Sequence, residues 1–369
     1  MSTKKNNKIV KNKFLMNLAL LQAKKFLGKT GINPSVGCII LNKKKELLSL
    51  SHTGINGRPH AEFLALRKLK KKAINSTLYV TLEPCSHYGQ TAPCTKQIIK
   101  KKVNKVYFSV IDIDKITSNK AKKILNTKNI HTNIGLLSGK VKKFYQYYYK
   151  NRIHKLPFVT CKIAMSKDGF IKNISSKNIS NIYSRKISNI LRSQNNAILI
   201  SSKTANDDNP TLNCRVEGLE KFSPKRIILD KNLKIKINSK IVKTSYDFKT
   251  IIFYNKINTS KINILKKRKI NLYKIKLNNQ NNLDLKEILK KIYKLNVSRL
   301  LIEGGKELTN SFMKESLIDE LLLFKSNENL GSKGRLNINN IIKMSNKKSK
   351  LKKKVIVNLE DDNLYKYIF

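Results

Sequence analysis

One short motif, taken with two cysteines further along the chain, constrains this sequence more than any other feature. His60 and Glu62 flank Ala61, and Cys85 and Cys94 follow. A histidine and two cysteines can fill three corners of a tetrahedral zinc site and leave the fourth corner for water, whose pKa the metal lowers. A glutamate two residues after the histidine can carry a proton from that water to a departing amine. The set therefore predicts a zinc-dependent nucleobase or nucleoside deaminase.

The surrounding pattern places these side chains at helix starts and at the end of a strand. Apolar residues recur at helical spacing from 60 to 69, so His60 and Glu62 fall in a first turn. Residues 77–82 are β-branched, aromatic or apolar and predict a strand, which ends shortly before Cys85. A His-x-Glu triplet alone is common, and a lone buried cysteine is usually a core residue. Only the combination, in this order and context, is specific.

Three segments resemble the deaminase half of the bifunctional riboflavin biosynthesis family, RibD: residues 33–38 (NPSVGC), 60–62 (HAE) and 81–94 (TLEPCSHYGQTAPC). Eight residues separate the two cysteines, as is typical of that family, whereas the generic deaminase signature has two. The resemblance implies that His60, Cys85 and Cys94 are the zinc ligands and that Glu62 is the proton donor. It leaves open whether Asn33 contacts the pyrimidine or only shapes its turn.

Predicted strands and helices alternate in the second half of the chain. This alternation predicts a mostly parallel sheet with helices on its faces. Gly304 and Gly305 follow one of the strands and precede a helix, where backbone N–H groups could hold a phosphate; a tight turn without a ligand is nearly as good an explanation. The predicted strands are 157–164, 197–201, 226–230, 250–254 and 299–302, and the helices are 183–194, 283–295 and one beginning at Lys306.

The same half resembles the reductase half of the RibD family, whose fold is similar to that of dihydrofolate reductase. The resemblance lies in residues 162–169, 191–192, 204–212, 215 and 303–305. It implies that NADPH is held by Ala164, Thr204, Asp208, Gly305, Lys306, Glu307, Leu308, Thr309, Asn310 and Ser311. It implies that the substrate is held by Ser176, Arg192, Leu212, Arg215 and Glu303. The two arginines suit a ribose phosphate, because guanidinium groups bond phosphate oxygens in pairs.

Three further residues are candidates for the reductase site. Lys162, like Glu303, is a charged residue in an otherwise apolar strand, which is costly unless it serves the site. Asn178 stands where the family carries a tryptophan in its cofactor-side loop, and Lys231 stands where a serine commonly helps to bind NADPH. The sequence therefore departs from the family pattern more in this half than in the deaminase half.

The length of 369 residues suits two domains with separate cores. We assign residues 1–150 to a cytidine-deaminase-like α/β/α domain and 151–369 to a dihydrofolate-reductase-like α/β domain, with the joint near Leu156 and Pro157. The tyrosine-rich run 141–152 predicts a helix at this joint rather than a platform for stacking bases. Residues 1–13 are expected to be a frayed tail, followed by an amphipathic helix over 14–27.

The formal net charge of +54 comes from lysines spread along the whole chain. Because they are not gathered on one element with interleaved aromatic residues, we expect a solvated basic surface rather than a dedicated nucleic-acid site. Five scattered cysteines do not suggest a disulfide framework. Residues 14–21 are too short for an export signal or a membrane span, so we expect a cytoplasmic enzyme without a membrane partner.

Motifs and resemblance together predict a two-step enzyme that uses one Zn²⁺ per chain and NADPH on a phosphorylated pyrimidine. It would deaminate 2,5-diamino-6-(5-phosphoribosylamino)pyrimidin-4(3H)-one and then reduce the ribosyl group to ribityl. Formation of a homo-oligomer through the reductase domain stays open. One alternative is a zinc deaminase of nucleic-acid bases with a degenerate second domain, which predicts steeply salt-dependent binding. Another is a non-catalytic RNA-binding or scaffold protein, which predicts no bound zinc.

Overall fold

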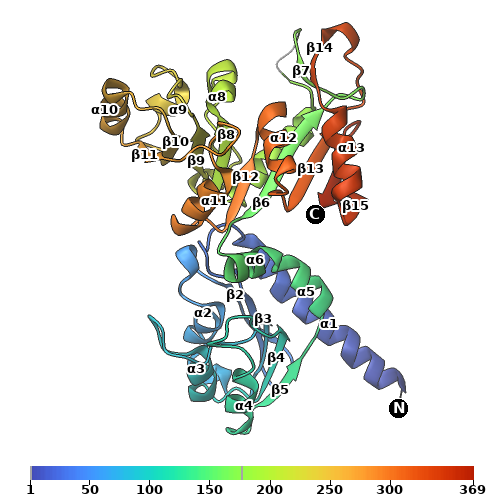
Figure 1. Ribbon diagram of the computed structural model, residues 1–369. Coiled ribbons are helices and arrows are strands. Elements are labelled where there is room, and N and C mark those ends of the chain that lie inside the picture. The colour runs from blue at the N-terminus through green and yellow to red at the C-terminus, as the bar shows by residue number, and fades with distance from the viewer. Residues whose placement is uncertain (1, 176–177) are drawn as a thin grey trace. The chain divides into compact units, whose positions relative to one another are not determined.

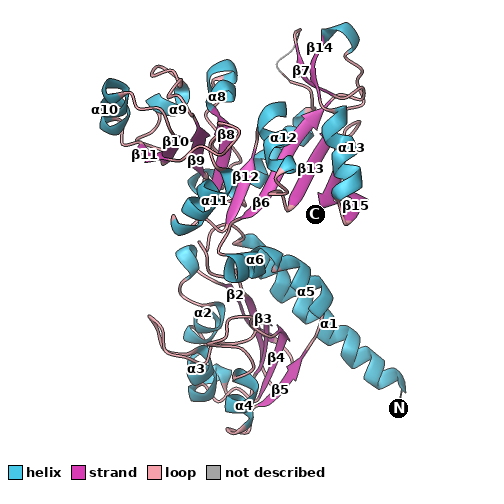
Figure 2. Ribbon diagram, in the orientation of Figure 1, coloured by secondary structure: helices cyan, strands magenta, loops and turns pink. Residues whose placement is uncertain are grey.

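The computed structural model describes residues 2–175 and 178–369, except for the side chains of residues 2–5, 8, 70 and 71. Contacts divide the chain into two compact units, Met1–Lys155 and Leu156–Phe369. Each unit has a β-sheet with helices packed against it (Figures 1 and 2). None of the helices in the described part of the chain is both long enough and apolar enough to cross a bilayer.

The N-terminal unit is built on a five-stranded sheet in the order β2-β1-β3-β4-β5. Strand β1 is antiparallel to both of its neighbours, and β3, β4 and β5 are parallel to one another. The predicted strand over 77–82 is confirmed, whereas β2 and β5 contain no fully buried residue and gave no clear apolar pattern. The strands are β1 Gly37–Leu41, β2 Leu47–His52, β3 Thr77–Leu82, β4 Lys105–Val110 and β5 His131–Ile134.

Helices cover both faces of this sheet, with α1 and α5 on one face and α2, α3 and α4 on the other (Figure 1). The pair α5 and α6 contains the tyrosine-rich run, so the helix predicted there is confirmed, in two pieces. The helices are α1 Ser2–Lys25, α2 Ala61–Arg67, α3 Cys94–Lys100, α4 Ala121–Asn126, α5 Ser138–Phe144 and α6 Gln146–His154, with short 3₁₀ turns at Ile55–Gly57 and Lys70–Ala73.

The frayed tail predicted for residues 1–13 is wrong, because α1 already begins at Ser2. The helix is anchored further along, where Leu15, Met16 and Ala19 are buried against the sheet. Once such a nucleus exists, each added residue costs little, so polar residues before it extend the helix. The Asn12 side chain also accepts a hydrogen bond from the Tyr79 hydroxyl at 2.8 Å, which fixes this part of α1 to β3.

The described residues of the C-terminal unit form a nine-stranded sheet in the order β11-β10-β9-β8-β12-β6-β13-β16-β15. The first seven strands in this order are parallel, which confirms the predicted mostly parallel sheet, and β16 is antiparallel to β13 and β15. The strands are β6 Phe158–Met165, β8 Ala197–Ser201, β9 Lys225–Leu229, β10 Thr250–Tyr254, β11 Asn271–Lys274, β12 Arg299–Ile302, β13 Glu320–Lys325, β15 Leu351–Lys354 and β16 Asn363–Ile368. Strands β7 Phe170–Asn173 and β14 Gly334–Asn337 pair separately.

Strand alternation divides the core of this unit into two layers. In β8, Ala197 and Leu199 pack with α11, α12 and α13, whereas Ile198 and Ile200 pack with α8, α9 and α10 on the other face. The helices are α7 Ile182–Ser193, α8 Ser202–Asp208, α9 Lys240–Lys243, α10 Thr259–Lys267, α11 Leu285–Lys294, α12 Lys306–Lys314 and α13 Asn339–Lys348, with 3₁₀ turns at Glu220–Phe222 and Gly331–Lys333.

Candidate functional site

The histidine and two cysteines singled out in the sequence converge in the N-terminal unit. His60 caps the start of α2, Cys94 is the first residue of α3, and Cys85 follows the end of β3. The Nδ1 atom of His60 is 3.4 Å from the Sγ atom of Cys85 and 3.4 Å from that of Cys94. Tetrahedral zinc with ordinary bond lengths would separate such nitrogen and sulfur ligands by about 3.6 Å. The donor set therefore fits zinc, and it is the one such group among the described residues.

The two sulfurs share polar contacts that favour a thiolate at this position. Cys85 Sγ accepts the backbone N–H of Cys94 at 3.3 Å. Hydrogen bonding from the Cys94 thiol and the nearby His60 lowers the pKa of the Cys85 thiol to about 4. The Cys94 thiol donates to that thiolate and is buried, so its own pKa is raised. A bound metal cation would take the place of the proton between the two sulfurs.

Glu62 lies in the first turn of α2 and is only 4% exposed. Burial raises the pKa of its carboxyl to about 7, against the opposing effect of His60. A carboxyl poised near neutral pH can both accept and release a proton. The Glu62 carboxyl lies beside the three metal-ligand candidates, and proton transfer in a zinc deaminase requires a carboxyl at this position.

His60, Cys85 and Glu62 line a recess of about 140 Å³, and Cys94 lies behind them, within reach of His60 and Cys85. Asn33 lies in its wall and also packs on Gly57, where an added Cβ would be 2.2 Å from the Asn33 side-chain nitrogen. Asn33 therefore occupies a position suited to both of its predicted roles. The recess is lined by Asn33, Pro34, Val36, Thr53, Gly57, Arg58, His60, Glu62, Leu82, Glu83, Cys85, His87, Asp112, Asp114, Thr117, Tyr148 and Arg152.

Several wall residues were not singled out from the sequence. The Glu83 carboxylate accepts the backbone N–H groups of Asp112, Asn119 and Ala121 at 3.0–3.1 Å and so fixes the loop after β4. Asp112 in turn accepts the hydroxyl hydrogen of Tyr148 at 2.8 Å. The only sequence signal for this network was an acidic residue at the end of an apolar strand, directly before a proline.

Tyr147 and Tyr148 of α6 are buried, and the two histidines near the motifs, His52 and His87, differ in position. Tyr147 and Tyr148 are each 1% exposed, so they form no open stacking platform. His52 stacks on Phe26 outside the recess, with 3.5 Å between ring centroids. His87 lines the recess, with its Nδ1 atom 3.2 Å from the Thr117 hydroxyl.

A second recess, of about 210 Å³, lies at the carboxyl ends of β8 and β12 in the C-terminal unit. It brings together five of the residues implied by the resemblance, namely Ala164, Thr204, Asp208, Glu303 and Gly305, with the further candidate Lys162. Gly305 caps the start of α12, which contains the predicted cofactor-binding residues 306–311. The sequence gave no indication of Lys172, which lines the recess and lies 3.6 Å from Asp208.

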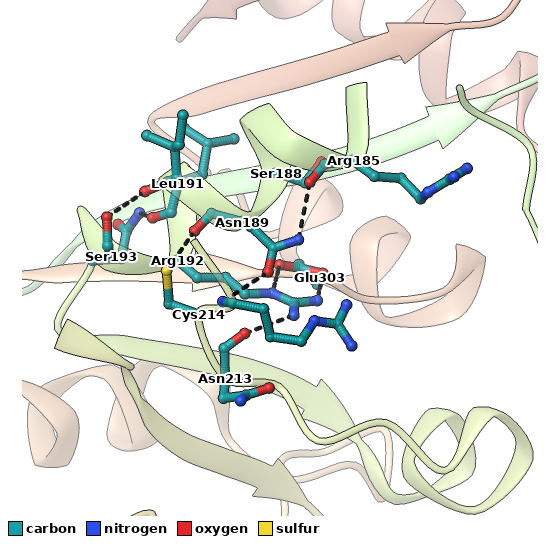
Figure 3. A network of polar contacts seen from close by, with 12 residues as sticks. Arg185, Ser188, Asn189, Leu191, Arg192, Ser193, Asn213, Cys214 and Glu303 are labelled. Atoms are coloured by element: carbon teal, nitrogen blue, oxygen red, sulfur yellow. Dashed lines mark hydrogen bonds and ion pairs between the residues drawn. The ribbon is translucent and has the colours of Figure 1, made fainter. Parts of the chain in front are cut away.

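Glu303 is held by Arg192 in a two-pronged ion pair (Figure 3). The Nε and Nη2 atoms of Arg192 donate to the two carboxylate oxygens at 2.8 and 2.9 Å, and Nη1 donates to the Asn213 carbonyl at 3.0 Å. Burial alone would raise the pKa of Glu303, but Arg192 holds it below its usual value. Burial also lowers the pKa of Lys162, which Glu303 partly opposes.

The other described residues predicted for the reductase site do not line the recess that contains Glu303. Arg215 is exposed and close enough to contribute to the lowered pKa of Glu303. Leu212 is 3% exposed and packs in the hydrophobic core, so its side chain is not at the recess surface. Lys231 donates to the Asn281 carbonyl, and Asn178 lines a separate hollow. Ser176 lies outside the described residues.

Comparison with known proteins agrees with both halves of the fold. Residues 9–110 match the family model "Cytidine and deoxycytidylate deaminase zinc-binding region", and residues 157–365 match "RibD C-terminal domain". The predicted fold class, a cytidine-deaminase-like domain followed by a reductase domain of the RibD type, is thereby confirmed.

Whole-chain relatives cover both units. The riboflavin biosynthesis protein RibD of Aquifex aeolicus is 34% identical, over 95% of this chain and 96% of its own. That of Buchnera aphidicola subsp. Baizongia pistaciae is 32% identical, over 88% and 89%. The solved structure of Acinetobacter baumannii RibD, form 1, is 26% identical, has a TM-score of 0.81, and covers 98% of this chain and 99% of its own. This chain therefore belongs to the RibD family of riboflavin biosynthesis enzymes, with a deaminase domain and a reductase domain.

Proposed function

We propose that this chain catalyses the two successive reactions predicted from its sequence. The first is hydrolytic deamination of 2,5-diamino-6-(5-phosphoribosylamino)pyrimidin-4(3H)-one, and the second is NADPH-dependent reduction of the ribosyl group to ribityl. The observation that carries the proposal is the convergence of His60, Cys85 and Cys94 on one another, at a recess that is also lined by the buried Glu62. A cytoplasmic location remains a prediction, as does assembly through the reductase domain.

In the deaminase domain, His60, Cys85 and Cys94 would hold the zinc ion, which supplies activation of a water molecule. Glu62 accepts a proton from that water and delivers it to the leaving amino group, so that ammonia departs and a carbonyl remains. The burial that raises the pKa of Glu62 to about 7 suits both halves of this transfer. Asn33, in the wall of the recess, is placed to orient the pyrimidine.

In the reductase domain, Thr204, Asp208 and the start of α12 at Gly305 line the side of the recess assigned to NADPH. NADPH bound there would supply the hydride for reduction at C1′ of the ribosyl group. Glu303 and Lys162 offer a hydrogen-bond acceptor and donor to the sugar hydroxyls at the same recess. Arg192 already donates three hydrogen bonds within the protein, so we assign the substrate phosphate to Arg215 and the fixing of Glu303 to Arg192.

The test is an assay of the purified chain with the diaminopyrimidine phosphate and NADPH, in which ammonia release and NADPH oxidation are followed separately. We expect both. Glu62→Gln should stop ammonia release at unchanged zinc content and should still oxidise NADPH when given the deaminated pyrimidine. Glu46→Gln, at an exposed position, is the matched control and should behave as wild type.

The two readouts separate the halves of the proposal. Ammonia release without NADPH oxidation would remove the reductase assignment and leave the deaminase assignment standing. Absence of ammonia release from zinc-loaded protein would remove the deaminase assignment. Full turnover by Glu62→Gln would remove Glu62 from its role.

A further inference from the structure

The recess of the deaminase domain is rich in carboxylates, although the proposed substrate carries a phosphate. Glu62, Glu83, Asp112 and Asp114 all line it. A phosphate near neutral pH carries close to two negative charges, so it needs a cationic partner to enter such a recess. The inference that follows rests on the proposed function, since it takes the substrate to be phosphorylated.

Two arginines line the recess, and they differ in how far their charge is already neutralised. The Nη1 atom of Arg152 lies 3.6 Å from Asp114, and its guanidinium lies over the Tyr148 ring at 5.3 Å. Among the described residues, Arg58 forms an ion pair with none of the acidic side chains. Arg58 is therefore the arginine in this wall whose charge is available to an anionic ligand.

The structure also fixes where the Arg58 guanidinium lies. Its Nη1 atom donates to the Thr91 hydroxyl at 2.7 Å. Its Nη2 atom lies close to Gly89, where an added Cβ would be 3.5 Å away. Gly89 and Thr91 belong to the loop between Cys85 and Cys94, so Arg58 connects the segment before His60 with that loop. One of its five N–H donors is used in this contact, and a guanidinium bonds phosphate oxygens in pairs.

The groups at the metal-ligand candidates and those around Arg58 differ in burial. Glu62, beside the metal-ligand candidates, is buried, whereas Arg58 is half-buried and both Gly89 and Thr91 are exposed. A pyrimidine that reacts beside Glu62 would thus have its ribosyl phosphate directed outward, toward the rim where Arg58 lies. We propose that Arg58, positioned by Thr91, binds the phosphate of the deaminase substrate and makes this recess select phosphorylated over dephosphorylated pyrimidine ribosides.

The experiment compares two substrates, the diaminopyrimidine ribosyl phosphate and the same compound without its phosphate, in the full zinc-loaded chain. Ammonia release gives kcat/KM for each. Arg58→Met should lower kcat/KM for the phosphorylated substrate by about ten- to a hundredfold, mainly through KM, the effect of losing a charged hydrogen-bonding partner. It should change the value for the dephosphorylated substrate by less than about twofold, since Arg58 would not touch that substrate.

Three other variants sharpen the comparison. Arg67→Met removes the same charge from an exposed position in the last turn of α2 and should leave both substrates unaffected. Arg58→Lys should be intermediate, because lysine keeps the charge but lacks the paired donors. Thr91→Val should reduce the preference for the phosphorylated substrate by a smaller factor than Arg58→Met, because it releases Arg58 without removing its charge.

The outcomes separate this inference from the proposed function. If wild type releases ammonia and Arg58→Met slows both substrates equally, or neither, the phosphate assignment is overturned while the deaminase assignment stands. If zinc-loaded wild type releases ammonia from neither substrate, the proposed function fails and the phosphate assignment fails with it. Zinc content per chain, measured for each variant, shows whether a loss comes from a damaged metal site, which would also count against Arg58 as a phosphate ligand.

Discussion

Replacing Arg192 by methionine should destabilise the reductase domain strongly and leave the deaminase domain unchanged. Arg192 and Glu303 are each only 13% exposed and are joined by two hydrogen bonds of 2.8 and 2.9 Å. Removing one partner of a buried ion pair leaves the other charge uncompensated, at a cost of about 3–5 kcal/mol. Lys162 lowers the pKa of Glu303 without forming an ion pair with it, so it offsets only part of this loss.

For a domain of this size, each kcal/mol lowers the Tm by about 2–4 °C, so the Tm of the reductase domain should fall by about 10 °C. Calorimetry of the full chain measures this, and a shift on adding NADPH identifies the reductase transition. Ammonia release should stay at the wild-type rate. The stability difference from wild type should shrink as the pH falls, because burial raises the pKa of Glu303 once Arg192 is gone and the carboxyl then takes up a proton, whereas in wild type Arg192 keeps that pKa lowered.

A second substitution shows whether the buried charge causes the loss. In the Arg192→Met background, Glu303→Gln removes the uncompensated carboxylate and should recover part of the lost stability. A single Arg192→Met variant within about 0.5 kcal/mol of wild type would refute the reasoning. So would a double variant whose stability equals the sum of two independent losses, since the two side chains would then not be coupled.

Three more predictions test other parts of the structure. Gly37→Ala should destabilise the deaminase domain by about 3 kcal/mol or more in denaturant unfolding, because the added Cβ would lie 1.9 Å from the Ala19 carbonyl oxygen. Gly139→Ala is the control and should not destabilise the domain, because the space around Gly139 is open. Arg226→Met should destabilise the reductase domain by about 3 kcal/mol, because the fully buried guanidinium donates to Thr250 and to several backbone carbonyls that would be left unpaired. Thermal unfolding of the variant measures this loss. Treatment with a zinc chelator should abolish ammonia release while NADPH oxidation with the deaminated substrate continues, and added zinc should restore the first activity.

The sequence was most informative where function depends on residue type and short spacing. His60, Glu62, Cys85 and Cys94 could be named because zinc chemistry restricts both the ligands and the order in which they occur. The parallel sheet of the reductase domain followed from alternating apolar runs. In contrast, the start of α1 was misjudged, because a polar helix end depends on the buried segment that nucleates it rather than on its own composition.

Contacts between distant residues explain most of what the sequence could not show. Arg192 and Glu303 were both predicted as substrate ligands, and their pairing across 111 positions is the basis of our proposal that Arg192 holds Glu303 in place. Asp112 and Tyr148 are 36 positions apart and joined by a hydrogen bond, so the sequence alone could not show that both line the deaminase recess. Arg58 appeared as one more basic residue in a chain with 77 of them until its contact with Thr91 placed it at the recess.

The central claim is that one histidine and two cysteines bind the catalytic metal, and X-ray absorption at the zinc edge of the purified chain tests it most directly. The account predicts one zinc per chain with two sulfur ligands at about 2.3 Å and two nitrogen or oxygen ligands at about 2.0 Å. Loss of one sulfur ligand in the Cys85→Ser variant would assign Cys85 as one of the two sulfur ligands. A chain that retains no zinc, or one whose zinc has four sulfur ligands, would contradict the account.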